Sequence, residues 1–391
     1  MSIHFNWLAF LLCAVPLSAQ AAATFKPLND AEVIEVLPTI TRSRPGAPDK
    51  ARLTADPRAA AVAAQQSISL ARQTGDNRHW GRAQAALTPW WDRNDAPIDL
   101  AVLQATVQQG RHEFEASRKV LAASLARQPA HAQGWLTMAA LERLSGRYRE
   151  SLAACSEVAN AGQALYAEAC TLETQSLMGD QAKATKGLAQ LAAQADTAGQ
   201  QSWLFSLLAE HHERAGQDAL ALSSFQLSLS REPDLYTAIG LADLLLRTSQ
   251  PKTALQVLST YPETDAVLLR RAIALRHLGD AQWRTKLTEF HGRVADLRRR
   301  GDDPQLHGRE LAMSALWLEG DAPRALQLAK QNLLLQREPV DWYMALLSAQ
   351  RSGDKPASSE LSAALKRTGL KDARLDALVL ARPQILTQAG P

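Results

Sequence analysis

The chain has 391 residues, of which 46% are hydrophobic and 21% are charged, a composition that excludes wholesale disorder. Lys and Arg together number 43 and Asp and Glu number 40, so the net charge of +3 is too small to indicate a nucleic-acid-binding protein. Three cysteines exclude a disulfide-dense scaffold, and the length taken alone suggests two or three domains.

Residues 1–21 have the pattern of a secretory signal peptide. An apolar stretch from Trp7 to Leu17 is followed by a small-residue cleavage site that ends at Ala21. This stretch is too short to span a bilayer. The segment contains no Lys or Arg, which leaves a buried N-terminal helix as the alternative. We expect cleavage after Ala21 and a periplasmic or secreted product, and no other segment predicts a membrane span.

Residues 22–56 predict an extended leader. The segment shows no helical periodicity, and it is rich in proline, which interrupts helices. The prolines of this segment are Pro27, Pro38, Pro45 and Pro48.

From residue 57 onward, small residues recur at intervals of 30 to 41 residues, with a mean close to 35. These residues are Gly75, Gly110, Gly146, Gly179, Gly216, Ser249, Gly279, Gly320 and Gly353. Because glycine readily adopts the left-handed conformation that ends a helix, each position predicts a turn between two helices. The pattern predicts nine helix pairs over residues 57–370, an all-α solenoid. A capping helix, Ala373–Leu380, is expected in the last segment, residues 371–391.

The side chains follow the same spacing. In the fifth unit, Ala209, Ala221 and Phe225 occupy the places where the first helix of a unit packs against the second. The long interval from Gly279 to Gly320 predicts a second helix lengthened by about two turns. An irregular helical bundle and a HEAT or Sel1-like solenoid are the alternative architectures.

This period, with one turn per unit, resembles that of tetratricopeptide repeats. Two segments, GDNRHWGRAQAALTPWW after Thr74 and QREPVDW near residue 340, are similar to a family of exported bacterial tetratricopeptide proteins without an assigned activity. The resemblance implies a superhelical array of helix pairs with a concave groove. It implies no enzymatic role.

Two cysteines of the expected mature chain are placed opposite each other. Cys155 falls in the second helix of the third unit and Cys170 in the first helix of the fourth, equidistant from the turn near Gly162. In an exported chain this placement predicts a disulfide. The alternative is two free thiols that act as small buried hydrophobes.

Catalytic and metal-binding patterns are weak. His211 and His212 are adjacent, so their rings point about 100° apart on a helix and are poorly placed to share a metal ion. His112 begins a segment like a zinc-protease motif, but the second histidine is missing. The sequence therefore predicts no enzyme, no cofactor and no metal site.

Arginine recurs near the end of the first helix in several units, where it would lie beside the concave groove. Such a row could bind carboxylates, and the alternative is that each arginine caps its own helix C-terminus. The arginines are Arg72, Arg143, Arg214, Arg247, Arg276 and Arg351, and all but Arg72 are proposed as groove residues. Aromatic residues on the same faces complete the candidate surface: Tyr166, Trp203, Tyr236, Trp317 and Tyr343.

The sequence thus predicts an exported tetratricopeptide scaffold that binds a protein or an extended peptide in its groove. Partners of other kinds, nucleic acid and membrane, are not expected. The alternative function is a structural assembly factor of the cell envelope, in which the solenoid is a spacer.

Overall fold

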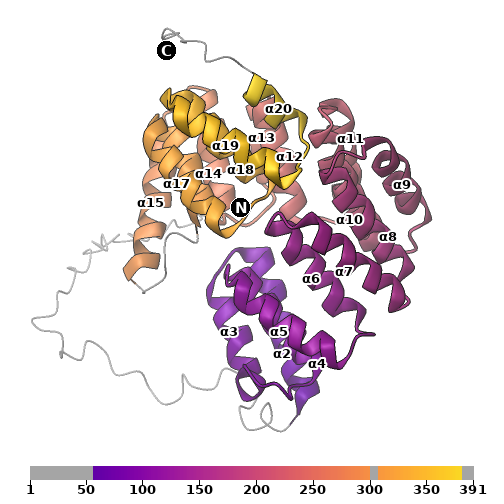
Figure 1. Ribbon diagram of the computed structural model, residues 1–391. Helices are drawn as coiled ribbons and strands as arrows, with labels where there is room; N and C mark the ends of the chain where they lie inside the picture. The colour runs from indigo at the N-terminus through magenta and orange to yellow at the C-terminus, as the bar shows by residue number, and fades with distance from the viewer. Residues whose placement is uncertain (1–55, 300–306, 381–391) are drawn as a thin grey trace, which may run out of the picture. The chain divides into compact units, whose positions relative to one another are not determined.

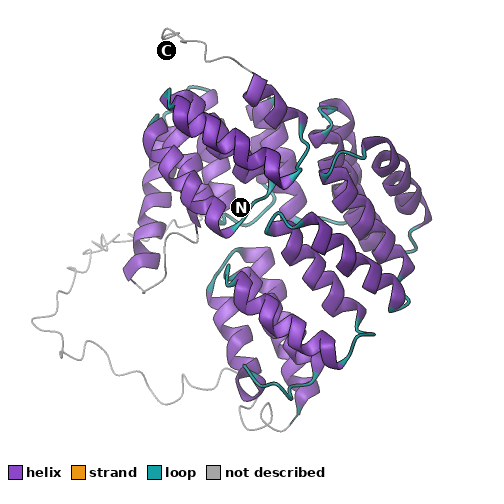
Figure 2. Ribbon diagram, in the orientation of Figure 1, coloured by secondary structure: helices purple, strands orange, loops and turns teal. Residues whose placement is uncertain are grey.

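The computed structural model describes residues 56–299 and 307–380, and every regular element within them is a helix (Figure 2). The predicted signal peptide, and the leader up to residue 55, lie outside these residues. None of the helices in the described ranges combines the length and the hydropathy that a bilayer crossing requires.

The described helices form nine consecutive pairs, each made of a first helix A and a second helix B (Figure 1). Pairs 1 to 3 are α2 (Pro57–Thr74) with α3 (Arg78–Leu87), α4 (Ile98–Gly110) with α5 (Phe114–Arg127), and α6 (Ala132–Leu144) with α7 (Tyr148–Asn160). Pairs 4 to 6 are α8 (Ala164–Leu177) with α9 (Gln181–Gln194), α10 (Ala198–Arg214) with α11 (Asp218–Arg231), and α12 (Leu235–Arg247) with α13 (Pro251–Leu258).

Pairs 7 to 9 are α14 (Asp265–His277) with α15 (Trp283–Arg299), α16 (Gly308–Ser314) with α17 (Ala322–Leu335), and α18 (Pro339–Ser352) with α19 (Lys355–Thr368). Two short helices, η2 (Thr88–Trp90) and η4 (Ala315–Glu319), extend α3 and α16. The last helix, α20 (Ala373–Leu380), has the predicted bounds and packs on α18. The protein is a tetratricopeptide-like α-solenoid of nine helix pairs over the described residues, and this confirms the predicted fold class.

The turns between A and B helices fall at the predicted residues, with one exception. Ser249 adopts the left-handed conformation with φ of 60°, as the glycines at equivalent places do. Gly110 is instead the last residue of α4, and His112 takes the left-handed conformation with φ of 60°. Gly110 has a different role: a Cβ there would lie 2.5 Å from the indole of Trp80, so only glycine allows this close packing.

The fifth pair shows why the repeat needs small residues. Ala209 in α10 and Ala221 in α11 are fully buried. Phe225 of α11 is 1% exposed, where pair 5 packs against pair 6. A Cβ at Gly240 of the next A helix would lie 3.1 Å from the ring of Phe225. Small side chains at the crossing points let the helices approach each other, and one large ring fills the remaining space.

The B helix of pair 7 is longer than its counterparts, as predicted. α15 has 17 residues, compared with 14 in α9, α11, α17 and α19. The lengthening within the described residues is about one helical turn, and the predicted figure of two turns stays a prediction, because α15 reaches the edge of the described residues. The interval from Gly279 to Gly320 also includes residues 300–306, which the structure does not describe.

Pairs that are far apart in the sequence also touch each other. The turn of pair 1 meets the loop after pair 6, where a Cβ on Gly75 would lie 2.8 Å from the Cβ of Thr264. The turn of pair 3 meets the loop after pair 8 at Arg337, and the turn of pair 4 meets the loop after pair 9 at Lys371. The offset is five pairs in each case (1 and 6, 3 and 8, 4 and 9). We call these the inter-turn contacts, because they join successive turns of the superhelix.

Two inter-turn contacts contain the same hydrogen bond. The backbone N–H of Arg337 donates to the carbonyl of Leu144 at 2.7 Å, and the N–H of Lys371 donates to the carbonyl of Leu177 at 2.8 Å. Leu144 and Leu177 are the last residues of α6 and α8, so no N–H group of the same helix donates to their carbonyl oxygens. Each of these two inter-turn contacts thus caps the C-terminus of an A helix.

A buried ion pair anchors the inter-turn contact at Arg337. Asp341, 1% exposed, accepts from the Nε of Arg309 at 2.7 Å and from the side-chain amide of Asn332 at 2.7 Å. Asp341 also accepts from the backbone N–H of Glu338 at 2.9 Å, which forms a capping box at the start of α18. Arg337, Glu338 and Asp341 of the segment QREPVDW therefore all take part in this junction.

Candidate functional site

Side chains of the A helices line two hollows, which together contain most of the predicted groove residues. The N-terminal hollow, about 750 Å³, lies along α2, α4, α6, α8 and α10. The C-terminal hollow, about 360 Å³, lies along the end of α10, α12, α14, α16 with η4, α18 and the start of α20. The predicted residues Arg143, Tyr166 and Trp203 line the first hollow, and Arg247, Trp317, Tyr343 and Arg351 line the second.

Seven amide and hydroxyl side chains line the N-terminal hollow beside apolar and aromatic residues. Within the described residues, the amides of Gln65 and Gln109 make no hydrogen bond, although each carries both donors and an acceptor. Sequence analysis did not single out these residues. The polar uncharged residues of the lining are Gln65, Ser69, Gln73, Thr106, Gln109, Gln133 and Thr137.

The two arginines of this hollow differ in their partners. Arg143 forms an ion pair with Glu173 at 3.0 Å, and Glu173 is 9% exposed. Arg72 is exposed and forms no ion pair or hydrogen bond with any described residue. Arg72 therefore keeps its guanidinium group available to a ligand, whereas the charge of Arg143 is neutralised within the protein.

An aromatic pair lies in the lining of the same hollow. The rings of Tyr166 and Trp203 have centroids 5.7 Å apart and are tilted by 34°. The hydroxyl of Tyr166 accepts from the side-chain amide of Gln200 at 3.2 Å, which fixes the orientation of the ring. The pair offers a rigid apolar surface next to the amide groups.

The C-terminal hollow has a more apolar lining. Leu246, Met313 and Trp317 face it, and burial raises the pKa of Tyr343. Arg351 forms no ion pair with a described residue and is exposed at the rim. This hollow therefore combines apolar surface with one available cation.

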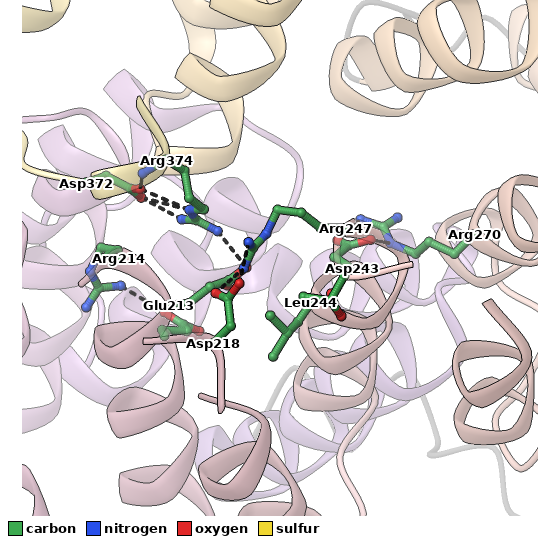
Figure 3. A network of polar contacts seen from close by, with 11 residues as sticks. Glu213, Arg214, Asp218, Asp243, Leu244, Arg247, Arg270, Asp372 and Arg374 are labelled. Carbon is green, nitrogen blue, oxygen red and sulfur yellow. Dashed lines mark hydrogen bonds and ion pairs between the residues drawn. The ribbon is translucent and has the colours of Figure 1, made fainter. Parts of the chain in front are cut away.

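The other arginines of the C-terminal hollow belong to a closed network of charges (Figure 3). Arg247 pairs with Asp218 at 2.7 Å and with Glu213 at 3.2 Å. Arg374 pairs with the same Glu213 at 2.7 Å and with Asp372 at 2.5 Å. The hydrogen bond from Arg247 lowers the pKa of Asp218, so this carboxylate stays ionised beside its partner. Sequence analysis missed the acidic members of this network and Arg374.

Three predicted groove residues lie in neither lining. The guanidinium group of Arg214 is 4% exposed and donates to the Oγ of Ser176 at 3.0 Å. Arg276 donates to the carbonyl of Trp317 at 2.9 Å and stacks on the ring of Trp283, 5.2 Å from its centroid. Tyr236 is 61% exposed, and the nearby carboxylate of Glu210 raises its pKa. The arginine row is thus not continuous, because its members are distributed among different environments.

The predicted disulfide is present. Cys155 in α7 and Cys170 in α8 are bonded, with their Cα atoms 5.7 Å apart, and both are buried in the core shared by pairs 2 to 4. The bond ties pair 3 to pair 4 at the N-terminal hollow, whose lining includes Cys170.

The histidines have structural surroundings. His211 is fully buried, with Nδ1 2.8 Å from the Oγ of Ser176 and Nε2 2.7 Å from the Oγ1 of Thr185. His212 instead lies 2.8 Å from the side-chain oxygen of Gln217. Across residues 56–299 and 307–380, no group of three or more His, Cys, Asp or Glu residues is arranged to hold a metal ion.

Comparisons with known proteins add little beyond the fold. Human IFIT1, in a dimer with PPP-AAAA, is similar to this chain with a TM-score of 0.44 and 10% identity, covering 75% of this chain and 69% of that one. The tetratricopeptide domain of P58(IPK) is similar with a TM-score of 0.21 and 13% identity, covering 75% of this chain and 99% of that one. No family model and no curated protein matches the chain. The assignment of the solenoid therefore rests on its own helix pairs.

Proposed function

We propose that this protein is an exported, non-catalytic scaffold that binds an extended segment of a partner protein in the N-terminal hollow. The observation that carries the proposal is a lining of A-helix side chains in which the amides of Gln65 and Gln109 and the guanidinium group of Arg72 have no partners among the described residues. Gln65 and Gln109 can donate to and accept from a peptide backbone, whose N–H and C=O groups need both.

The charged and aromatic residues of the hollow favour a particular partner chemistry. Arg72 is suited to a carboxylate, which a guanidinium group binds through two parallel hydrogen bonds. Tyr166 and Trp203 are suited to an apolar side chain, and Tyr, Trp and Arg are the residue types that contribute most to binding at interfaces. The proposed partner segment is therefore extended and carries an acidic residue near an apolar one.

Site-specific photocrosslinking in the periplasm tests the binding site. A photoreactive residue at Gln133, in the hollow, is compared with one at Lys119, on the exposed face of α5. We expect a specific adduct only from Gln133. Adducts from Lys119 alone would overturn the proposal and would favour a spacer whose groove is not used.

A charge reversal supplies the matched control. Arg72→Glu should reduce the adduct about tenfold or more, whereas Arg58→Glu, at the exposed N-terminal end of the same helix, should leave it unchanged. Equal effects of the two variants would mean that the partner responds to net charge rather than to the hollow.

Export is tested separately. Mass spectrometry of the protein purified from a periplasmic extract should give a chain that begins at Ala22. An intact N-terminus together with a cytoplasmic location would contradict the export part of the proposal.

A further inference from the structure

The segment Leu370–Arg374, which joins α19 to the first residues of α20, is held against pairs 4 and 5. The N–H of Lys371 donates to the carbonyl of Leu177, and a Cβ on Gly179 would lie 2.9 Å from the side chain of Lys371. Ala373 approaches the turn of pair 5 in the same way, 3.2 Å from a Cβ placed on Gly216. The segment therefore follows two successive turns.

Charge holds the end of this segment. The guanidinium group of Arg374 lies between Asp372 in its own loop and Glu213 at the end of α10 (Figure 3). Glu213 also pairs with Arg247, so the two arginines share one carboxylate. Removal of Arg374 from this site would leave Glu213, Asp218 and Arg247 as a smaller network that remains paired.

Apolar contact in this region is limited. Leu370 and Leu375 are buried in the core that extends from pair 5 to pair 9. Among the eight residues of α20 that the structure describes, Leu375 is the one buried residue, and Leu380 is 79% exposed. Regions with few buried apolar contacts open at a lower free energy than the core of the same protein.

The segment also forms part of the wall of the C-terminal hollow. Arg374 and Glu213 line the hollow together with apolar residues of α12, α16 and α18. Arg374 is the one residue of the segment in this lining, so movement of the segment would remove its side chain from beside these apolar residues.

We propose that Leu370–Arg374 is a latch that closes the C-terminal hollow and opens while the nine helix pairs remain folded. In the closed state Arg374 pairs with Glu213 at the wall of the hollow. In the open state Arg374 leaves the wall, Glu213 stays paired with Arg247, and the apolar residues of the hollow become more accessible. This inference concerns a different hollow from the one in the proposed function and does not depend on it.

The inter-turn contact at Arg337 provides an internal reference. Both contacts contain a backbone hydrogen bond to the end of an A helix and a buried carboxylate paired with an arginine, Asp341 with Arg309 and Asp372 with Arg374. They differ in the apolar packing of the helix that follows: α18 buries Trp342 and Met344 among eight residues, whereas Leu375 is the one buried residue among those of α20 that the structure describes. Opening should therefore affect Lys371 and leave Arg337 protected.

Amide hydrogen exchange of the whole mature protein measures this difference. In the wild type, the amide of Lys371 should exchange faster than that of Arg337. Arg374→Ala should accelerate exchange at Lys371 by about tenfold or more and leave Arg337 unchanged. Arg324→Ala, which removes an exposed ion pair with Glu319, should change neither. Equal acceleration at Lys371 and Arg337, or none at Lys371, would overturn the proposal.

A thiol at the hollow reports on its accessibility. Cys155 and Cys170 are bonded to each other, so Val340→Cys, in the lining of the hollow, gives a single reactive thiol in the described residues. Its maleimide labelling should be about tenfold faster with Arg374→Ala than without it. An unchanged labelling rate would show that the segment does not cover the hollow.

A conservative variant keeps the test valid if Arg374→Ala destabilises the whole array. Arg374→Lys retains the positive charge but loses the planar pair of donors, so it should give an intermediate acceleration at Lys371 and at the thiol. Full acceleration by Arg374→Lys, with unchanged thermal unfolding, would equally support the latch. No acceleration by either variant would reject it.

Discussion

The two hollows of this solenoid are built from the same repeated position and nevertheless differ in chemistry. In the N-terminal hollow, Arg72 has no partner among the described residues, and glutamine side chains line the same hollow. In the C-terminal hollow, Arg247 is held by Glu213 and Asp218, and Glu213 is shared with Arg374 from the end of the array. The role of a repeated arginine therefore depends on whether the neighbouring pair presents acidic residues to it, as pair 5 presents Glu213 and Asp218 to Arg247.

The difference extends to how each region is held together. A covalent bond between Cys155 and Cys170 ties the pairs beside the N-terminal hollow. Buried charge anchors the C-terminal pairs, through Asp341 and Arg309. Four sets of substitutions test this difference between the two regions.

The largest effect is expected at the buried charge of the C-terminal region. Asp341→Ala leaves Arg309 without its fully buried partner and also removes an acceptor from Asn332. We expect the free energy of unfolding, measured in urea, to fall by about 3–5 kcal/mol. Asp354→Ala, which removes only an N-cap bond to Ala357, should cost about 1 kcal/mol. A smaller loss for Asp341→Ala than for this control would refute the anchor.

The disulfide should contribute a similar or slightly smaller amount in the N-terminal region. Cys155 and Cys170 are 15 residues apart in the sequence, and closing a loop of that size stabilises by about 3 kcal/mol on the chain-entropy model. The double variant with Ser at both positions should lose about this much in urea unfolding. Mass spectrometry of the non-reduced protein should find no free thiol at either cysteine, and two free thiols would contradict the bond.

Acid should weaken the protein through His211, which lies between the two regions in α10. Burial lowers the pKa of His211 from 6.5 to about 4. His211 therefore becomes protonated near pH 6.5 in the unfolded chain but only near pH 4 in the folded protein. As pH falls through this window, the stability that depends on a neutral His211 is lost, by roughly 2–3 kcal/mol.

The comparison of His211→Gln with the wild type isolates this group, because other titrations are common to both proteins. The stability of the wild type relative to the variant should fall between pH 6.5 and pH 4 and change little above pH 7. A pH-independent difference would mean that His211 has the same pKa in both states.

The smallest effects should separate paired arginines from available ones. Arg247→Ala removes two ion pairs in a partly buried network and should cost about 1–2 kcal/mol of unfolding free energy. Arg351→Ala, at the rim of the same hollow, should cost less than about 0.5 kcal/mol. Equal costs would show that the ion pairs of Arg247 do not distinguish it from a surface arginine.

Local features were predicted well from the sequence. The nine turns, the bounds of α20 and the pairing of Cys155 with Cys170 follow from periodicity and from positions on neighbouring helices. The errors were also local in origin. Gly110 was interpreted as a turn residue because its spacing fits, but it is needed where Trp80 packs on α4, and His112 forms the turn.

The candidate site was predicted only in part. Seven of the ten predicted groove residues line one hollow or the other, because the A-helix face is fixed by the repeat. Arg214 instead donates to the Oγ of Ser176, and Arg276 donates to the carbonyl of Trp317. The availability of an arginine could not be predicted, since spacing places a side chain on a face but does not identify its partner.

By itself the sequence determined the unit, the number of units and the disulfide, because each depends on residues within about one repeat of each other. Only the tertiary structure decided that Lys371 caps α8 and that Arg374 reaches Glu213. These contacts join the end of the array to pairs 4 and 5. They depend on small rotations that accumulate from one pair to the next. The total rotation over several pairs cannot be predicted from a local sequence pattern.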